Sequence, residues 1–239
     1  LQSFPGNPVW WSLIPYNTLM PSTVLFFDLD DTLYPNTNGL WEAIRLRMTD
    51  YLRDQLGFPP EEIQEIRQTY YETYGTTLRG LQTHHEVDED EYLSFVHNLP
   101  LDEYLSPDGE LRKMLESLPQ RKWIFTNADA RHAKRVLQTL GIEDCFSGII
   151  DVRALDFLCK PDRLAYSRAL ELAGENNPEN CVLFDDSIRN LVPAHQAGFT
   201  TVLVGSAEQN QAADYSVASL KDLPRVFTQL WPSKSKQQR

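Results

Sequence analysis

The segment Val-Leu-Phe-Phe-Asp-Leu-Asp-Asp-Thr at residues 24–32 decides the fold. Its continuous apolar run, 24–27, ends directly at a carboxylate, Asp28. A run this short, with no alternating polar residues, is typical of a strand that is buried on both faces of a parallel sheet. Ligands of α/β proteins collect at the carboxyl ends of such strands. The segment therefore predicts a buried strand with a polar site immediately after it.

Four later apolar runs have the same form, at residues 122–125, 148–150, 181–184 and 201–204. Between them lie three helical patterns, at residues 130–140, 163–173 and 187–197. A glycine follows each helical pattern, in the position of a left-handed C-terminal cap. Strands that alternate with helices of this length predict an α/β fold with a doubly wound parallel sheet.

The chain between the first two predicted strands is helical only, from about residue 40 to 105. Apolar residues recur there at three- and four-residue steps from Trp41 to Leu56, and Pro59-Pro60-Glu61-Glu62 starts a second helix that runs through Tyr70. Further helical stretches follow around 78–82 and 89–96. A crossover connection does not need so many residues, so this stretch is interpreted as an inserted helical cap or lid.

The predicted domain organisation follows from this insert. We expect a core domain made of residues 20–37 and 106–232, interrupted by a helical cap domain at residues 38–105. Residues 1–19 are an N-terminal extension without an assigned role, and they lack the basic start and compact apolar stretch of a signal peptide. Residues 233–239 are expected to form a flexible tail.

Composition excludes several classes of function. The chain has 239 residues with 34 Asp and Glu against 22 Lys and Arg, a net charge of −12, which argues against binding a nucleic acid polymer or an acidic membrane surface. No apolar run approaches the roughly 20 residues of a membrane helix. Cys145, Cys159 and Cys181 are too scattered for a disulfide framework or a CxxC metal site. They are expected to be buried thiols, as in a cytoplasmic protein. The sequence leaves the oligomeric state open.

Polar residues follow several of the predicted strands. The first strand is followed by Asp28, Asp30 and Asp31, the second by Thr126-Asn127, and the fourth by Asp185-Asp186-Ser187. Lys160-Pro161 precedes the helix that leads into the fourth strand. Carboxylates at several strand ends crowd one edge of the sheet and repel one another, and a bound cation relieves that repulsion. An all-oxygen site that must also contact a substrate phosphate suits Mg²⁺.

This set of residues has a direct use in phosphoryl transfer. Asp28 leaves the strand first and can attack phosphorus to form an aspartyl-phosphate. Asp30 can protonate the leaving-group oxygen and then activate the hydrolytic water. Lys160 can neutralise charge on the phosphoryl group, to which the Thr126 hydroxyl and the Asn127 amide can donate hydrogen bonds. Taken singly, each motif is equally compatible with an ordinary turn or helix cap, so the prediction depends on their joint occurrence.

These motifs resemble those of the haloacid dehalogenase (HAD) superfamily of phosphohydrolases, and the helical insert lies where the C1 cap of that superfamily lies. Three segments are also similar to its pyrimidine 5′-nucleotidase branch: Asp-Leu-Asp-Asp-Thr-Leu-Tyr-Pro at 28–35, Tyr-Gly-Thr-Thr-Leu-Arg-Gly-Leu at 74–81 and Phe-Asp-Asp-Ser-Ile-Arg-Asn at 184–190. The resemblance implies a HAD-like, Rossmann-like core and a Mg²⁺-dependent phosphatase. Its substrate would be a small phosphorylated metabolite, namely a pyrimidine nucleoside 5′-monophosphate.

The resemblance also implies residue roles. Asp28 would be the nucleophile and a metal ligand, and Asp30 the acid and base, with its backbone carbonyl on Mg²⁺. Asp186 would be the direct metal ligand of the last motif. Asp185 would lie behind Asp186 and act on the metal indirectly or through water. Asn190 would orient the loop that carries both. Substrate contacts would come from Tyr74, Arg79 and His85 in the cap, although His85 beside His84 is equally compatible with a surface histidine.

Several alternatives remain open at this point. A haloacid dehalogenase has no need of an acid two residues after its nucleophile, so Asp30 favours phosphate chemistry. A phosphomutase, a sugar-phosphate phosphatase or a phosphoglycolate phosphatase of the same superfamily would keep every motif. A receiver-like signalling domain lacks a cap insert and has its aspartate in mid-chain. A non-catalytic protein built on this fold is disfavoured because every motif residue is present.

Overall fold

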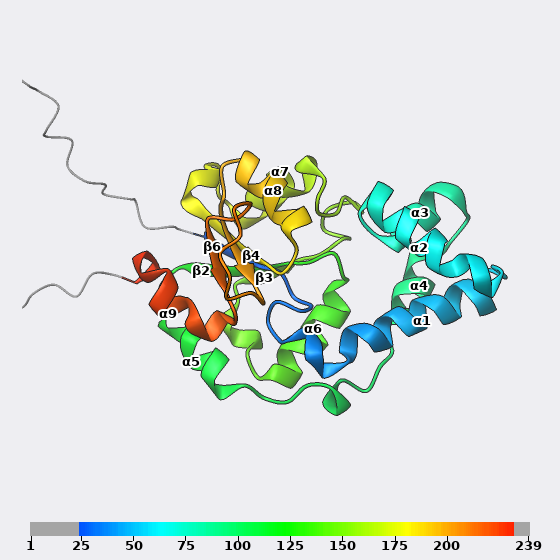
Figure 1. Ribbon diagram of the computed structural model, residues 1–239, viewed down its shortest axis with the longest axis horizontal. Helices are drawn as coiled ribbons and strands as arrows, with labels where there is room; N and C mark the ends of the chain where they lie inside the picture. The colour runs from blue at the N-terminus through cyan, green and yellow to red at the C-terminus, as the bar shows by residue number, and fades with distance from the viewer. Residues whose placement is uncertain (1–23, 232–239) are drawn as a thin grey trace, which may run out of the picture.

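The computed structural model describes residues 24–231, and within this range the backbone forms one six-stranded sheet with helices on both faces (Figure 1). The predicted N-terminal extension and C-terminal tail lie outside the described residues. The strands are β1 (Val24–Phe27), β2 (Arg121–Phe125), β3 (Gly148–Ile150), β4 (Cys181–Asp185), β5 (Thr200–Val204) and β6 (Tyr215–Val217). Their order is β3-β2-β1-β4-β5-β6, and every neighbouring pair is parallel.

The first apolar run forms an inner strand of this sheet, as predicted. In β1, Phe26 lies opposite Trp123 of β2 and Leu183 of β4. The chain order reverses at this point, because β2 leads to one edge of the sheet and β4 to the other. Ligands of doubly wound sheets bind at such a switch point. The edge strand β6 was not predicted, because Tyr-Ser-Val is too short and too polar to stand out as a buried run.

Successive residues of β1 point to opposite faces and enter two separate apolar clusters. Leu25 and Phe27 pack with α5 (Gly109–Ser117), α6 (Ala130–Leu140) and α9 (Leu223–Val226). Val24 and Phe26 pack with α7 (Arg163–Ala173) and α8 (Ile188–Gln196) on the other face. All four β1 side chains are fully buried. This two-sided burial explains why the strand is a continuous apolar run, and it confirms the predicted doubly wound fold.

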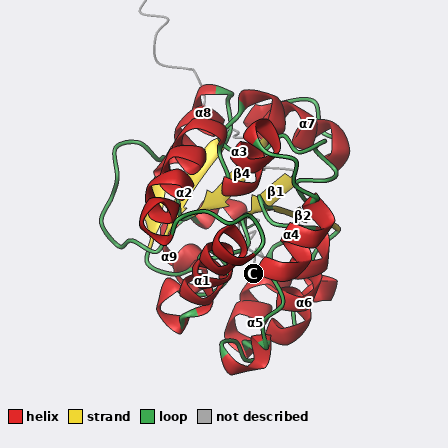
Figure 2. Ribbon diagram, turned by 90° about the vertical axis from the view of Figure 1, so that its right-hand side faces the viewer, coloured by secondary structure: helices red, strands yellow, loops and turns green. Residues whose placement is uncertain are grey.

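The helical insert lies at the carboxyl ends of the strands. It consists of α1 (Leu40–Asp54), α2 (Pro60–Tyr74), α3 (Thr77–His84) and α4 (Glu89–Val96), at the right of Figure 1. Figure 2 looks onto this end, with the insert helices in front of the strands. The insert has its own apolar cluster, which includes Leu52, Ile63, Leu81 and Tyr92. The predicted helices of the insert are all present, α4 at the predicted residues and the other three with shifted ends. The division of the chain into core and cap domains stays a prediction.

Close contacts join the insert to the sheet domain. Arg189 of α8 donates hydrogen bonds to the carbonyls of Tyr71 and Glu72, and its guanidinium lies 4.4 Å above the Tyr71 ring. Gly75, at the end of α2, has a φ of +93° and lies so close to Cys159 that a Cβ would stand 2.6 Å from the sulfur. The insert is therefore held against the loop that carries Lys160. In the described residues, none of the helices combines the length and apolar character needed to cross a membrane.

Candidate active site

The residues predicted to act on phosphate meet at the carboxyl ends of β1, β2 and β4. Asp28 follows β1, Thr126 follows β2, and Asp185 is the last residue of β4. Carboxylate oxygens of Asp28, Asp185 and Asp186 all lie within 4.8 Å of one another. This proximity arises because β1 and β4 are neighbours in the sheet although they are far apart in the sequence.

A buried lysine lies between two of these carboxylates. Lys160 Nζ is 2.8 Å from Asp28 Oδ1 and 2.6 Å from Asp185 Oδ2, and the residue is only 1% exposed. Burial alone would lower the pKa of Lys160, but Asp185 and Asp28 outweigh it and raise that pKa. Lys160 therefore remains a cation in direct contact with Asp28.

Asp185 and Asp186 have different surroundings. Asp185 is fully buried, and its oxygens accept hydrogen bonds from the Ser187 backbone, the Asn190 amide and Lys160. Asp186 lines the large cavity at the site, and among the described residues its carboxylate accepts a side-chain hydrogen bond from the Thr32 hydroxyl alone, at 3.5 Å. Asp185 has little capacity left for a further ligand, whereas Asp186 has free oxygens at the cavity surface.

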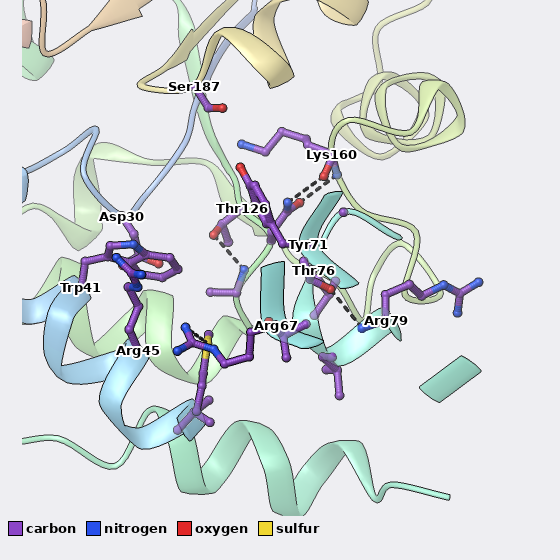
Figure 3. A pocket seen from close by; sticks show the side chains of 18 of the residues that line it. Asp30, Trp41, Arg45, Arg67, Tyr71, Thr76, Arg79, Thr126, Lys160 and Ser187 are labelled. Carbon is purple, nitrogen blue, oxygen red and sulfur yellow. Dashed lines mark hydrogen bonds between the residues drawn. The ribbon is translucent and has the colours of Figure 1, made fainter. Parts of the chain in front are cut away.

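Asn127 holds the backbone of Lys160. Its Nδ2 donates to the Lys160 carbonyl at 2.9 Å, and its Oδ1 accepts from the Lys160 amide at 2.8 Å. The side-chain amide, which was predicted to bind phosphoryl oxygens, is thus engaged with the loop before α7. The Thr126 hydroxyl accepts from the Ala128 amide at 3.0 Å and faces the same cavity as Asp28. Figure 3 shows Thr126 and Lys160 on the sheet side of this cavity.

Asp30 contacts two donors, Tyr34 and His132, that belong to none of the predicted motif roles. The Tyr34 hydroxyl donates to Asp30 Oδ1, and His132 Nε2 lies 3.1 Å from the same oxygen. Burial would raise the pKa of Asp30, but the neighbouring imidazole of His132 and the Tyr34 hydroxyl together hold that pKa below its usual value. Asp30 is therefore a carboxylate in the free protein, which is the form that a general base requires.

A second histidine supports the first. The rings of His97 and His132 stack with their centres 4.2 Å apart, and His97 Nδ1 lies 2.8 Å from Asp129 Oδ2. Burial, followed by the neighbouring His132, lowers the pKa of His97, so this ring is neutral and donates its Nδ1–H to Asp129. Asp129 also caps α6 by accepting from the His132 backbone amide. No periodicity or motif spacing in the sequence indicates these two histidines.

A cavity of about 740 Å³ extends from Asp28 into the insert. Of the three insert residues predicted to contact substrate, Arg79 lines it, whereas Tyr74 and His85 are not among its lining residues. Tyr74 pairs through its hydroxyl with His84, and His85 pairs through Nε2 with the Tyr70 hydroxyl at 2.9 Å. Other insert side chains line the cavity instead, among them Trp41, Arg45, Arg67, Tyr71 and Tyr92.

The donor set at the rim suits a hard divalent cation. The pKa of Asp186 is raised to about 6, first by burial and then by Asp185, and burial raises the pKa of Asp28 well above its usual value. Asp31 Oδ1 is buried without a hydrogen-bond partner among the described residues. Crowded carboxylates of this kind are stabilised by a cation that prefers oxygen ligands. Asp28 and Asp186 have the oxygens best placed to hold one.

A family model for haloacid dehalogenase-like hydrolases matches residues 23–198 of the chain. The Saccharomyces cerevisiae protein "Phosphate metabolism protein 8" is 31% identical over 194 residues, which is 75% of this chain and 60% of the yeast protein. The chain therefore corresponds to less than two thirds of that relative.

Solved structures share the fold at lower sequence identity. A HAD phosphatase from Thermococcus onnurineus has a TM-score of 0.59 and is 18% identical, with 85% of this chain and 96% of that chain covered. An L-2-haloacid dehalogenase from Xanthobacter autotrophicus has a TM-score of 0.55 at 18% identity, with 85% and 97% covered. Because a phosphatase and a dehalogenase are about equally similar, the structural likeness defines the fold and leaves the reaction to the side chains.

Proposed function

We propose a function from one premise: this chain belongs to the family of haloacid dehalogenase-like hydrolases. The proposal is a Mg²⁺-dependent phosphatase that hydrolyses small phosphate monoesters through an aspartyl-phosphate on Asp28. The observation that carries it is the placement of Lys160 between Asp28 and Asp185, with Asp30 lining the same cavity. A dehalogenase has no use for a second carboxylate at Asp30, whereas phosphate hydrolysis needs both an acid and a base.

The reaction has two steps in this proposal. The Asp28 carboxylate attacks phosphorus, and the bond to the leaving-group oxygen breaks while Asp30, having taken up a proton, donates it to that oxygen. Asp30 then removes a proton from water, which attacks phosphorus and breaks the bond to Asp28, so that phosphate is released and Asp28 is regenerated. Lys160 neutralises phosphoryl charge throughout, and the Thr126 hydroxyl donates to a phosphoryl oxygen.

Mg²⁺ would be held by Asp28, Asp186 and the backbone carbonyl of Asp30. Asp185 would lie behind these ligands and keep Lys160 in place. The cation supplies charge neutralisation at the crowded carboxylates and at the phosphoryl oxygens. Asp185 is the weaker candidate ligand because its oxygens already accept hydrogen bonds from Lys160, Ser187 and Asn190.

We propose nucleoside 5′-monophosphates, pyrimidine ones first, as the starting substrate class. The cavity of about 740 Å³ has room for a nucleotide, and Trp41 and Tyr71 offer aromatic rings in its lining. Arg79 remains the candidate donor to a base or ribose, whereas Tyr74 and His85 would need to leave their partners His84 and Tyr70 to take part. A cytoplasmic location stays part of this proposal.

The test is a screen of phosphate monoesters with Mg²⁺ and with chelator, reported as kcat/KM. We expect turnover with Mg²⁺ only, with UMP and CMP preferred over AMP and GMP. Beryllofluoride should bind at Asp28 as a phosphoryl mimic. A preference for purine nucleotides or sugar phosphates would overturn the substrate class alone, whereas full activity in excess chelator would overturn the metal-dependent mechanism.

A further inference from the structure

The cavity has opposite charges at its two ends. All of its lining carboxylates, namely Asp28, Asp30, Asp31 and Asp186, come from the sheet domain. The insert contributes three arginines to the lining and no Asp or Glu, although residues 40–96 contain twelve Asp and Glu against five Arg. The insert is thus acidic overall, yet its side of the cavity is basic. This arrangement suits a ligand that is negatively charged at its far end as well as at the reacting phosphate.

Arg67 is fixed in place without a carboxylate partner. One terminal nitrogen donates to Thr49 Oγ1 at 2.9 Å, and the other lies 3.6 Å from Met48 Sδ. Its Nε is buried and has no hydrogen-bond partner among the described residues. A buried donor without an acceptor is costly, and an arginine held only by neutral groups is prepared to bind an oxyanion.

Arg45 and Tyr92 add two further donors beside Arg67. Both side chains line the same cavity as Arg67, and burial lowers the pKa of Arg67, to which the like charge of Arg45 adds. Tyr92 is 2% exposed, and its hydroxyl has no partner among the described residues. Arg45 is exposed, lines the cavity and forms no ion pair within residues 24–231. Figure 3 shows Arg67 extending from α2 toward the side of the cavity where Arg45 of α1 lies.

We infer that Arg45, Arg67 and Tyr92 form an anion subsite for the leaving group, so that the enzyme selects phosphate monoesters carrying a second acidic group, a carboxylate or a further phosphate. This inference rests on the proposed phosphatase function and moves its substrate class from nucleotides with an uncharged base, such as UMP and CMP, to monoesters whose leaving group is acidic. An oxyanion there satisfies the Arg67 Nε–H and the Tyr92 hydroxyl and relieves the repulsion between two arginines. A neutral leaving group would leave at least part of this set without an acceptor.

The competing interpretation is that these arginines contact the reacting phosphate itself. In that case their removal lowers kcat/KM for every phosphate monoester by the same factor. In the subsite interpretation, their removal lowers kcat/KM for acidic leaving groups much more than for neutral ones. The ratio between matched substrates therefore separates the two, whatever the absolute rates.

Two matched substrate pairs provide the test. 3-Phosphoglycerate and glycerol 3-phosphate differ by a carboxylate in place of a hydroxymethyl group, and orotidine 5′-monophosphate and UMP differ by one carboxylate on the base. kcat/KM is measured for both pairs in the wild type, Arg67→Gln and Tyr92→Phe. The control is Arg53→Gln, which removes an exposed α1 arginine that pairs with Asp50 and Asp54 outside the cavity. p-Nitrophenyl phosphate is assayed in parallel as a substrate without a second acidic group.

We expect the wild type to favour the acidic member of at least one pair by about 10-fold or more. The ratio should collapse toward 1 in Arg67→Gln, fall less in Tyr92→Phe and persist in Arg53→Gln. The subsite would be overturned if the kcat/KM ratio of acidic to neutral substrate is near 1 for both pairs in the wild type, or if the ratio is undiminished in Arg67→Gln. Turnover of p-nitrophenyl phosphate would still uphold the phosphatase in either case. If no monoester is turned over, the proposed function fails. The subsite is then judged by calorimetric affinity for orotidine against uridine, with equal affinity refuting it.

Discussion

His132 Nε2 lies 3.1 Å from Asp30 Oδ1, and this contact joins the proposed acid and base to the interior of the sheet domain. The His132 side chain is fully buried, stacks on His97, and extends from the first turn of α6. The Tyr34 hydroxyl binds the same Asp30 oxygen. Asp30 is thereby fixed in one orientation by two groups, even though it stands in a turn rather than in a strand.

Replacement of His132 by leucine should lower kcat roughly 10- to 100-fold with a smaller change in KM, because Asp30 loses a fixed partner but the phosphate site is unchanged. The loss should be largest for alkyl phosphates, which depend most on protonation of the leaving group. His132→Gln, whose amide nitrogen can reach toward Asp30, should recover part of the rate. Exposed His195 supplies the control, as His195→Gln. An equal loss for alkyl and aryl phosphates would contradict the positioning role.

Asp28→Asn should abolish turnover while the protein stays folded. The substitution removes the attacking charge at nearly constant volume, and Lys160 keeps Asp185 as its partner. Steady-state rates and the thermal unfolding midpoint should be measured on the same preparation. Substantial activity in the pure variant would exclude Asp28 as the nucleophile.

Lys160→Met should destabilise the protein by about 3–5 kcal/mol, because it leaves the fully buried Asp185 without its cation. Adding Asp185→Asn to this variant should restore much of the loss, since the charge and its partner are then both gone. Urea denaturation of the two single variants and the double variant in chelator gives the coupling free energy. Strictly additive losses would mean that the two residues do not stabilise each other.

Metal-free protein should lose stability through Asp186 as the pH rises from about 4 to 6. Its pKa is about 6 in the fold, whereas an unfolded Asp titrates near 3.9, so the folded state holds more protons in this window and its free energy of unfolding falls with pH. Other carboxylates with lowered pKa act in the opposite direction, so the contribution is read as the difference between the wild type and Asp186→Asn.

In chelator, Asp186→Asn should have a higher free energy of unfolding than the wild type. This difference should grow between about pH 4 and 6 and level off at higher pH. With Mg²⁺ present the order should reverse, because the cation competes with the proton for the carboxylate and its affinity increases with pH. Unfolding midpoints at four or five pH values, with and without Mg²⁺, check both statements. A pH-independent difference between the two proteins in chelator would show that Asp186 is not proton-linked.

The sheet and the phosphate end of the site could be predicted because both depend on one local pattern. Asp28, Thr126 and Asp185 each follow or end a buried apolar run, and parallel strands bring their carboxyl ends to one edge. Lys160 was included as a cation just before the helix that leads into β4, but its contacts with two carboxylates depend on a loop whose path no periodicity indicates.

The rest of the site could not be predicted for identifiable reasons. His97 and His132 meet through ring stacking between the end of α4 and the start of α6, which leaves no pattern in the sequence. Helical periodicity indicates the apolar side of α1 and α2 but not which of their polar residues line a cavity. In the sequence alone, Arg45 and Arg67 therefore resemble ordinary surface charges. Asn127 lies at the predicted place, yet its amide is engaged with the Lys160 backbone.

The pairing of β1 with β4 has a consequence for protein synthesis. During synthesis Asp28 is made before the insert, whereas Lys160, Asp185 and Asp186 follow Asp28 by more than 130 residues. Domains form progressively from the N-terminus during translation, so a nascent chain that ends before Lys160 carries the proposed nucleophile without its cation, and one that ends before Asp186 lacks the proposed metal partner. The proposed phosphatase activity would therefore begin only once the chain has been made through Asp186, and termination before that point would yield a product without it.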